Sequence, residues 1–280
     1  MKGVTLTDRS NEAMRARASR RALACAILTA ILILAGCSSN DPLQPQIDPE
    51  MANLSKEQVF EKAEAFYEQE KWARARRFYA HVYENYPNDP LGRRALLRVA
   101  DTYFSQGDPV NLIEAQYKYR DFVNRYPGSD RADYAMLQIA MVSFKQMERP
   151  DRDQTKTFEA IDKVNEMIAA YPNSPLRPEA EKRLQEARDR LARHDHLVAA
   201  FYLHSGNARA ALGRLNTIVE EYPNYDRRAE VFYDLGRALT ALGREGEAKL
   251  YFERVISEFP DSEWAPRAKE KLGAATVAES

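Results

Sequence analysis

An aromatic residue followed by proline recurs along the chain, and this pair constrains the fold more than any other feature of the sequence. It recurs five times, at Tyr86-Pro87, Tyr126-Pro127, Tyr171-Pro172, Tyr222-Pro223 and Phe259-Pro260. Proline stops a helix, and the Asn, Asp or Ser that usually follows favours the start of the next one. A chain punctuated in this way predicts a series of helix pairs.

Small and aromatic residues repeat at fixed distances before these prolines. They are Ala63, Phe66, Ala75, Tyr79 and Val82 in the first unit, Ala199, Tyr202, Ala211, Leu215 and Ile218 in the fourth, and Gly236, Leu239, Ala248, Phe252 and Val255 in the last. This pattern is typical of tetratricopeptide (TPR) repeats, in which a small residue lets two helices touch and an aromatic ring fills the space beside them.

The sequence therefore predicts an all-α, TPR-like superhelix of five antiparallel helix pairs. The predicted pairs are 55–86, 90–126, 130–171, 176–222 and 226–259. A closing helix over 263–272 would cover the last apolar edge, as repeat proteins require.

The first helix of the fourth pair is predicted to be unusually long. Nothing between Leu176 and His204 breaks a helix of about 29 residues, ~43 Å in length. This helix either bridges two halves of one stack or divides an N-terminal module, 55–175, from a C-terminal module, 176–280, each with its own partner.

The N-terminal segment has the pattern of a bacterial lipoprotein signal. Basic residues from Arg15 to Arg21 precede an apolar run that is shorter than a membrane-spanning helix and ends in Leu34-Ala35-Gly36-Cys37. This ending matches a lipobox, in which small residues admit the peptidase and the cysteine thiol accepts the lipid. We expect residues 1–36 to be removed, Cys37 to carry the lipid and 37–54 to form a flexible tether. The alternatives are an uncleaved anchor or an ordinary secretory signal.

No pattern in the sequence indicates catalysis, a cofactor or a metal ion. The chain lacks the glycine-rich phosphate loop, the metalloprotease motif and the nucleophile elbow. His194-Asp195-His196 is the one histidine cluster, and side chains two residues apart on a helix point in different directions. A net charge of −1 argues against nucleic-acid binding, and two cysteines are too few for a disulfide scaffold. We therefore expect a binding protein and not an enzyme.

The first helix of each TPR pair normally faces a concave groove, so residues on these helices are candidates for peptide binding. The candidates are Phe60, Tyr67, Leu97, Phe104, Tyr134, Leu137, Met141 and Phe144. One position is aromatic in three successive pairs, at Tyr67, Phe104 and Phe144. These rings either pack between repeats or line a groove for an extended, aromatic-containing peptide.

Two arginines in the fourth pair lack an acidic residue one helical turn away. For Arg214 the neighbouring positions hold Ala210, Ala211, Thr217 and Ile218, and Arg209 is similarly placed. An arginine without a local partner favours an acid from elsewhere, either across the stack or on a partner protein. Arg209 and Arg214 are therefore candidate docking residues.

The lipobox, the short tether and five helix pairs together resemble the BamD family of outer-membrane lipoproteins. The most family-like stretches are 151–174, 181–202 and 206–211, which begin with Asp151-Arg152-Asp153-Gln154, Glu181-Lys182-Arg183-Leu184 and Gly206-Asn207-Ala208. Ser38 after the lipid cysteine is similar to signals that direct lipoproteins to the periplasmic face of the outer membrane.

The resemblance implies a non-enzymatic scaffold of the β-barrel assembly machinery. It implies that the N-terminal half binds unfolded outer-membrane proteins by holding the C-terminal strand signal of the nascent barrel. It also implies that the C-terminal half docks the periplasmic region of a BamA-type barrel subunit, with a contacting arginine near Arg214. Other assembly-machinery lipoproteins would be further partners. The alternatives are a TPR lipoprotein that organises cell-wall or Tol-type envelope complexes and a periplasmic enzyme wrapped by TPR helices.

Overall fold

The computed structural model describes residues 50–278, and within this range every regular element is a helix. The helices are α2 (Lys56–Glu68), α3 (Trp72–Asn85), α4 (Pro90–Gln106), α5 (Pro109–Arg125), α6 (Ala132–Lys145), α7 (Thr155–Ala170), α8 (Arg177–His204), α9 (Ala208–Glu221), α10 (Arg228–Ala241), α11 (Glu245–Glu258) and α12 (Trp264–Ala278). The predicted all-α fold is confirmed. Residues 1–36 and Cys37 lie outside the described residues.

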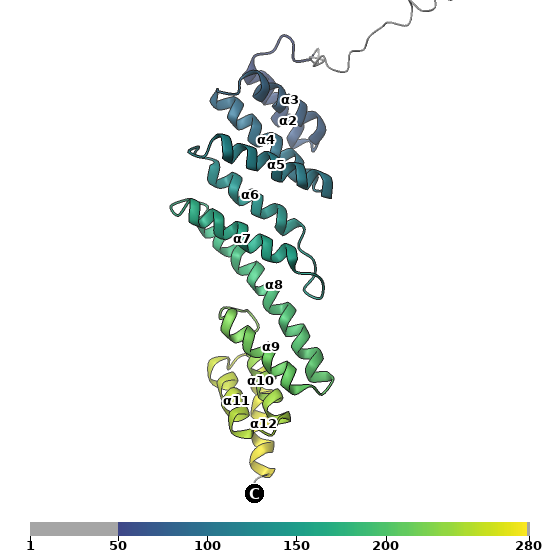
Figure 1. Ribbon diagram of the computed structural model, residues 1–280, viewed down its shortest axis with the longest axis vertical. Coiled ribbons are helices and arrows are strands. Elements are labelled where there is room, and N and C mark those ends of the chain that lie inside the picture. Colours follow the sequence, from purple (N-terminus) through teal and green to yellow (C-terminus); the bar gives the residue numbers. More distant parts are fainter. Residues whose placement is uncertain (1–49, 279–280) are drawn as a thin grey trace, which may run out of the picture. The chain divides into compact units, whose positions relative to one another are not determined.

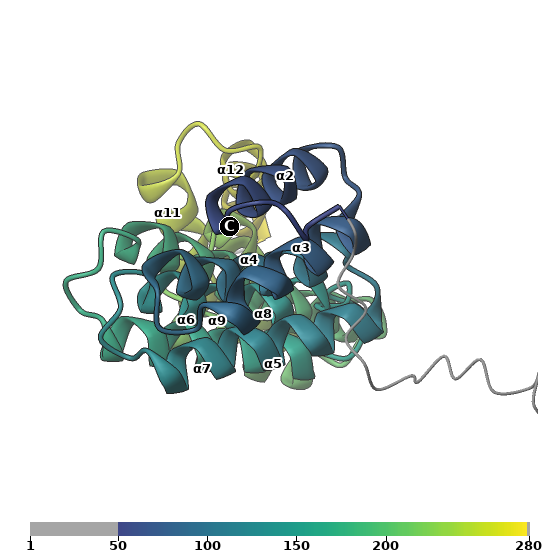
Figure 2. The same cartoon turned by 90° about the horizontal axis from the view of Figure 1, so that it is seen from above.

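Consecutive helices pack against each other in chain order, as Figure 1 shows. The pairs are α2 with α3, α4 with α5, α6 with α7, α8 with α9 and α10 with α11, and α12 covers the last pair by packing on α11 and α10. Figure 2 looks along the stack, with α5 and α7 at its lower edge and α4 and α6 above them. The TPR-like pairing predicted from the proline spacing is confirmed. No helix among residues 50–278 is both long enough and apolar enough to cross a membrane.

The repeated aromatic-proline pairs end the second helix of each pair, as predicted. The aromatic residue of each pair occupies the position just after the helix, where the backbone leaves the helical conformation. These residues are Tyr86, Tyr126, Tyr171, Tyr222 and Phe259. The Tyr126 hydroxyl donates to the Pro87 carbonyl at 2.9 Å, and the Tyr171 hydroxyl donates to the Pro127 carbonyl at 3.2 Å. These tyrosines therefore also tie each of these turns to the one before it.

The long helix α8 runs for 28 residues and begins at Arg177. It packs against α7 and against α9. Ala180 near its start belongs to an apolar cluster with Val164 and Met167 of α7, whereas Ala192 and Ala199 belong to the cluster that α9 to α12 build. One helix thus contributes to two cores.

Gly236 lies at a close contact between α10 and α11. A Cβ atom at this position would lie 2.5 Å from the Phe252 ring, a distance that side chains do not tolerate. Phe252 is buried, and so is its neighbour Tyr233, whose ring centroid lies 5.7 Å away. The glycine therefore lets α10 approach α11 closely.

We expect Gly236→Ala to lower the free energy of unfolding by about 1–3 kcal/mol, because the added methyl overpacks the contact with Phe252. Gly213→Ala in α9 is the control, since a Cβ there meets nothing within 4 Å. That change should stabilise the helix by roughly 0.5–1 kcal/mol. Urea unfolding followed by circular dichroism measures both, and equal effects would contradict the close contact.

Candidate functional site

A groove of about 1190 Å³ runs over the first helices of the first three pairs. Its lining comes from α2, α4 and α6, the end of α5 and the turn between α5 and α6. The lining residues are Glu64, Pro90, Arg93, Arg94, Leu97, Arg98, Asp101, Phe122, Arg125, Tyr126, Pro127, Gly128, Ser129, Asp130, Arg131 and Tyr134. The set combines five arginines with aromatic rings and only three acids, so the groove suits an anionic or polar ligand with apolar parts.

Arg98 on α4 forms the centre of a buried network in the floor of this groove. Its guanidinium donates to both carboxylate oxygens of Glu64, from Nε at 2.9 Å and from Nη2 at 2.7 Å. Its Nη1 donates to Asp101 at 3.1 Å. The guanidinium also lies 3.9 Å from the centre of the Tyr67 ring. Arg98 therefore joins α2 to α4 and forms an ion pair with each of the two acids.

Asp101 is buried and accepts hydrogen bonds from two tyrosines as well. The Tyr119 hydroxyl donates to it at 2.7 Å and the Tyr134 hydroxyl at 3.0 Å. Burial raises the pKa of Asp101 above its ordinary value, while the bonds from Tyr119 and Arg98 act in the opposite direction. Burial likewise raises the pKa of Tyr119 and Tyr134, so both hydroxyls stay protonated donors. This network fixes α4, α5 and α6 relative to each other.

The remaining arginines of the groove lie over aromatic rings. Arg94 lies 4.9 Å from the centre of the Phe60 ring, Arg93 5.8 Å from Tyr126 and Arg131 5.5 Å from Tyr134. Arg125 instead pairs with Asp121 at 2.7 Å. Within residues 50–278, Arg93, Arg94 and Arg131 form no ion pair, so their charges face the groove without a carboxylate partner.

The groove lies at a different part of the first helices than the sequence predicted. Of the candidate residues, only Leu97 and Tyr134 line it. Phe60 is buried against Tyr79 with 6% of its surface exposed, so the expectation that its ring is open to a peptide is wrong. Leu137 is also buried.

The other aromatic candidates are half-buried and pack between repeats. Tyr67, Phe104 and Phe144 lie near the C-terminal ends of α2, α4 and α6, whereas the groove lies at the N-terminal ends of α4 and α6. Phe104 packs beside the core of the second pair, and Phe144 and Met141 pack beside that of the third. Helical spacing placed these rings on the correct helices but not at the groove.

Sequence analysis did not identify the arginines of the groove. Arg93, Arg94 and Arg131 each follow the proline of an aromatic-proline pair by four to seven residues, so they come at the start of a first helix. A recurring basic residue after the turn was the signal available. This pattern does not by itself indicate a binding site, because charged residues at helix starts usually belong to solvent-exposed faces.

Arg214 has an acidic partner in the neighbouring helix. Its Nη1 donates to Asp195 of α8 at 2.8 Å. The acid expected from outside α9 is thus supplied across the stack, which is the first of the two predicted alternatives. Arg209 is exposed and forms no ion pair with any residue that the structure describes.

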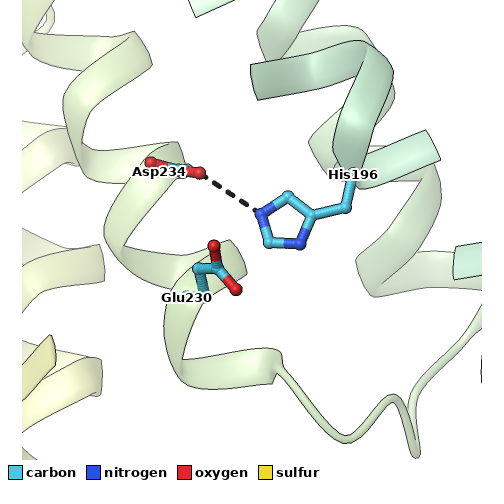
Figure 3. A group of neighbouring side chains, drawn as sticks. All are labelled: His196, Glu230 and Asp234. Atoms are coloured by element: carbon cyan, nitrogen blue, oxygen red, sulfur yellow. Dashed lines mark hydrogen bonds and ion pairs between the residues drawn. The ribbon is translucent and has the colours of Figure 1, made fainter. Parts of the chain in front are cut away.

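A second polar cluster joins α8 to α10 (Figure 3). His196 Nε2 lies 3.2 Å from Asp234 Oδ2, and Glu230 lies on the same side of α10 with a ligand atom within 4.8 Å of both. Arg237 donates to Asp234 at 2.9 Å, and Arg193 and Arg227 lie 3.8 and 3.5 Å from Glu230. Three arginines balance the negative charge of the two carboxylates. We therefore interpret this cluster as a set of polar contacts that holds α8 against α10.

His194 and His196 contact different elements although they are two residues apart. His194 Nδ1 lies 2.7 Å from the Pro150 carbonyl in the loop before α7, and His196 faces α10. The Nδ1 atom of His196 is buried without a hydrogen-bond partner in the described structure. The two imidazoles therefore form no shared site.

Comparison with known proteins gives one family. The model of the family described as "YfiO: Outer membrane lipoprotein" matches residues 52–250. A protein of Rickettsia prowazekii named outer membrane protein assembly factor BamD is 24% identical over 242 residues, which cover 86% of this chain and 93% of that protein.

A Caulobacter vibrioides protein with the same name is 25% identical over 193 residues, covering 69% of this chain and 62% of that protein, which is less than two thirds of its length. Among solved structures, the TPR2AB domain complex of yeast Sti1 aligns with a TM-score of 0.42 and 15% identity over 79% of this chain and 84% of that chain.

Proposed function

This chain belongs to the YfiO family of outer membrane lipoproteins, and we propose that it is a scaffold subunit of the machinery that assembles β-barrel proteins in the outer membrane. The observation that carries the proposal is a relative, named an outer membrane protein assembly factor, that aligns over 93% of its own length. The role is binding without catalysis. It needs one surface for the substrate and another for the machinery.

The groove over α2, α4 and α6 is the proposed substrate surface. Unfolded outer-membrane proteins present extended segments in which side chains and backbone groups are both free to bind. Tyr126 and Tyr134 offer ring faces, and the arginines beside them offer hydrogen-bond donors to carbonyl and carboxylate oxygens. The Arg98 network joins α2 to α4 within this surface.

The C-terminal pairs are the proposed docking surface for a BamA-type barrel subunit. Arg209 offers an exposed charge, and Arg214 is half exposed, with 49% of its side chain accessible, despite its bond to Asp195. Other assembly lipoproteins are proposed as additional partners. Lipid on Cys37 would hold the chain at the periplasmic face of the outer membrane, with residues 37–54 as the tether.

Co-purification from detergent-solubilised envelopes tests this assignment. The account predicts that the tagged chain captures a BamA-type barrel subunit in stoichiometric amount. Capture of cell-wall or Tol-type envelope proteins without the barrel subunit would contradict the account and support the alternative scaffold.

We expect Arg209→Glu to weaken capture of the barrel subunit while the melting temperature stays unchanged, because an exposed interfacial charge is reversed. Arg120→Glu on α5 is the matched control, an exposed arginine in a different pair. Arg214→Glu places two carboxylates together, so it should both weaken capture and lower stability. Combining Arg214→Glu with Asp195→Arg rebuilds the ion pair with its charges exchanged, so it should restore stability but not capture of the barrel subunit. If the double variant recovered both, Arg214 would be a structural residue only.

A further inference from the structure

Four large apolar side chains are exposed on the outer side of two second helices. Val110, Ile113 and Tyr117 of α5 have 70%, 65% and 63% of their surface exposed, and Phe158 of α7 has 55%. Large apolar side chains that gather in the open usually mark a contact with a protein or a membrane. We propose that these four residues, the α5–α7 patch, rest on the surface of a phospholipid bilayer. This contact goes beyond the proposed scaffold role and uses neither of its two surfaces.

Helical spacing places the three α5 residues of the patch on one side of that helix. Positions 110, 113 and 117 are three and four residues apart, so they follow each other along one face, while Leu112 and Ala115 on the other face are buried. Gln116 of α5 hydrogen-bonds Glu159, which is next to Phe158 in α7. The apolar groups of the two helices therefore lie near each other, along the edge of the stack where Figure 2 shows α5 and α7.

The patch lies outside the concave sites that we describe. The groove over α2, α4 and α6 and two smaller hollows beside α8 are lined by other residues. Peptides and small molecules usually bind in a cleft that surrounds them. A bilayer is a broad surface, and it takes up apolar side chains that point outward from a helix lying in its interface. The position of the patch therefore favours a bilayer over a peptide.

The charges around the patch are balanced. Glu159 pairs with Lys156 at 2.6 Å, and the Asp108 side chain accepts from the first amides of α5. The other charged side chains beside the patch are two acids and two bases, namely Glu114, Asp162, Lys118 and Arg120. A balanced rim does not select a strongly charged protein, and it is not repelled by a bilayer of mostly zwitterionic lipid.

The proposed lipid on Cys37 would hold the patch close to a bilayer. Residues 37–49 separate this cysteine from the described structure, and fully extended they span at most ~45 Å. A short flexible connection gives an effective concentration on the order of a millimolar. A contact with a dissociation constant on the order of a millimolar is then already half occupied, so four apolar side chains suffice.

Fluorescence quenching by brominated phospholipids tests the inference on the mature protein purified from membranes. The protein is reconstituted into vesicles of phosphatidylethanolamine and phosphatidylglycerol, with or without bromine in the upper part of the acyl chains. Tyr117→Trp places a probe in the patch, and Leu250→Trp on α11 is the matched control, because Leu250 is also an exposed apolar residue. The unchanged protein gives the background from Trp72 and Trp264.

We expect bromine to remove roughly half of the emission that the added tryptophan at position 117 gives, because interfacial side chains lie about 5–10 Å deep, near the bromine atoms. The emission added at position 250 should not change.

Val110→Asp with Ile113→Asp, made in the Tyr117→Trp protein, should lower the equilibrium constant for bilayer contact roughly 10-fold, since two apolar contacts are replaced by charges that stay in water. Both side chains are mostly exposed, so helical circular dichroism and the melting temperature should stay unchanged. Leu250→Asp in the same protein is the control and should leave the quenching at position 117 as it was.

Absence of bromine quenching at position 117, or equal quenching at positions 117 and 250, would overturn the inference. Capture of the barrel subunit tests the proposed function separately, and the two aspartates should leave it unchanged. If they abolished capture, the patch would belong to a protein partner and the inference would be wrong. A dimer of the unchanged protein that the two aspartates dissociate would likewise assign the patch to a second copy of the chain.

Discussion

Replacing Arg98 by methionine is expected to lower the free energy of unfolding by about 3–5 kcal/mol, the typical cost of removing one member of a buried ion pair. The loss arises because Asp101 stays buried without its cation and Glu64 loses both of its hydrogen bonds from the guanidinium. Methionine retains most of the apolar stem, so lost packing contributes little. Urea unfolding followed by helical circular dichroism gives the value.

Arg125→Met is the matched control for this prediction. Its ion pair with Asp121 has similar geometry at 2.7 Å, but 52% of the arginine side chain is exposed. Exposed pairs contribute only about 0.2–1 kcal/mol. Adding Asp101→Asn to Arg98→Met should recover part of the loss, because the amide oxygen still accepts from Tyr119 and Tyr134 without a buried charge. An Arg98→Met loss no larger than that of Arg125→Met would contradict the network.

Replacing Cys37 by serine is expected to abolish lipid attachment. A serine hydroxyl does not replace the thiol as lipid acceptor, so the variant would remain a precursor that the lipoprotein peptidase does not cleave. Stable membrane anchoring needs more than one acyl chain, and this variant would have none. We expect the amount in the outer-membrane fraction to fall by at least ~10-fold.

Metabolic labelling with palmitate measures this directly. Cys25→Ser is the control, because this cysteine lies in the segment that we expect to be removed, and it should leave labelling unchanged. Palmitate that persists in the Cys37→Ser protein would contradict the lipoprotein prediction.

The sequence predicted the helix pairs well because the signals involved are local. Tyr126 and Pro127 directly follow the last residue of α5, which ends at Arg125. Asp89 directly precedes α4 and caps it by accepting a hydrogen bond from the Leu91 amide at 2.8 Å. The close approach at Gly236 was also predictable, since only a small residue fits beside an aromatic at that repeat position. Such features depend on spacing, which a single sequence contains.

The candidate functional surface was harder to predict because it depends on the packing of separate pairs. Arg98 meets Glu64 from the preceding pair, and Arg214 meets Asp195 nineteen positions earlier on another helix. Helical spacing gives the side of a helix that faces inward, but not which end of it the next repeat covers. This is why the sequence left two positions open for Tyr67, Phe104 and Phe144, in a groove or between repeats, and the structure places them half-buried between repeats.

Site-specific photo-cross-linking tests the central claim most directly. Gly128 lines the groove, and a Cβ atom there would meet nothing within 4 Å, so this position is suited to a photoreactive phenylalanine derivative. Gly246 in α11 has similar open space and provides the control outside the groove. The account predicts that, in cells, unfolded outer-membrane proteins are cross-linked from position 128 and not from position 246. Equal cross-linking at both positions, or none at position 128, would contradict it.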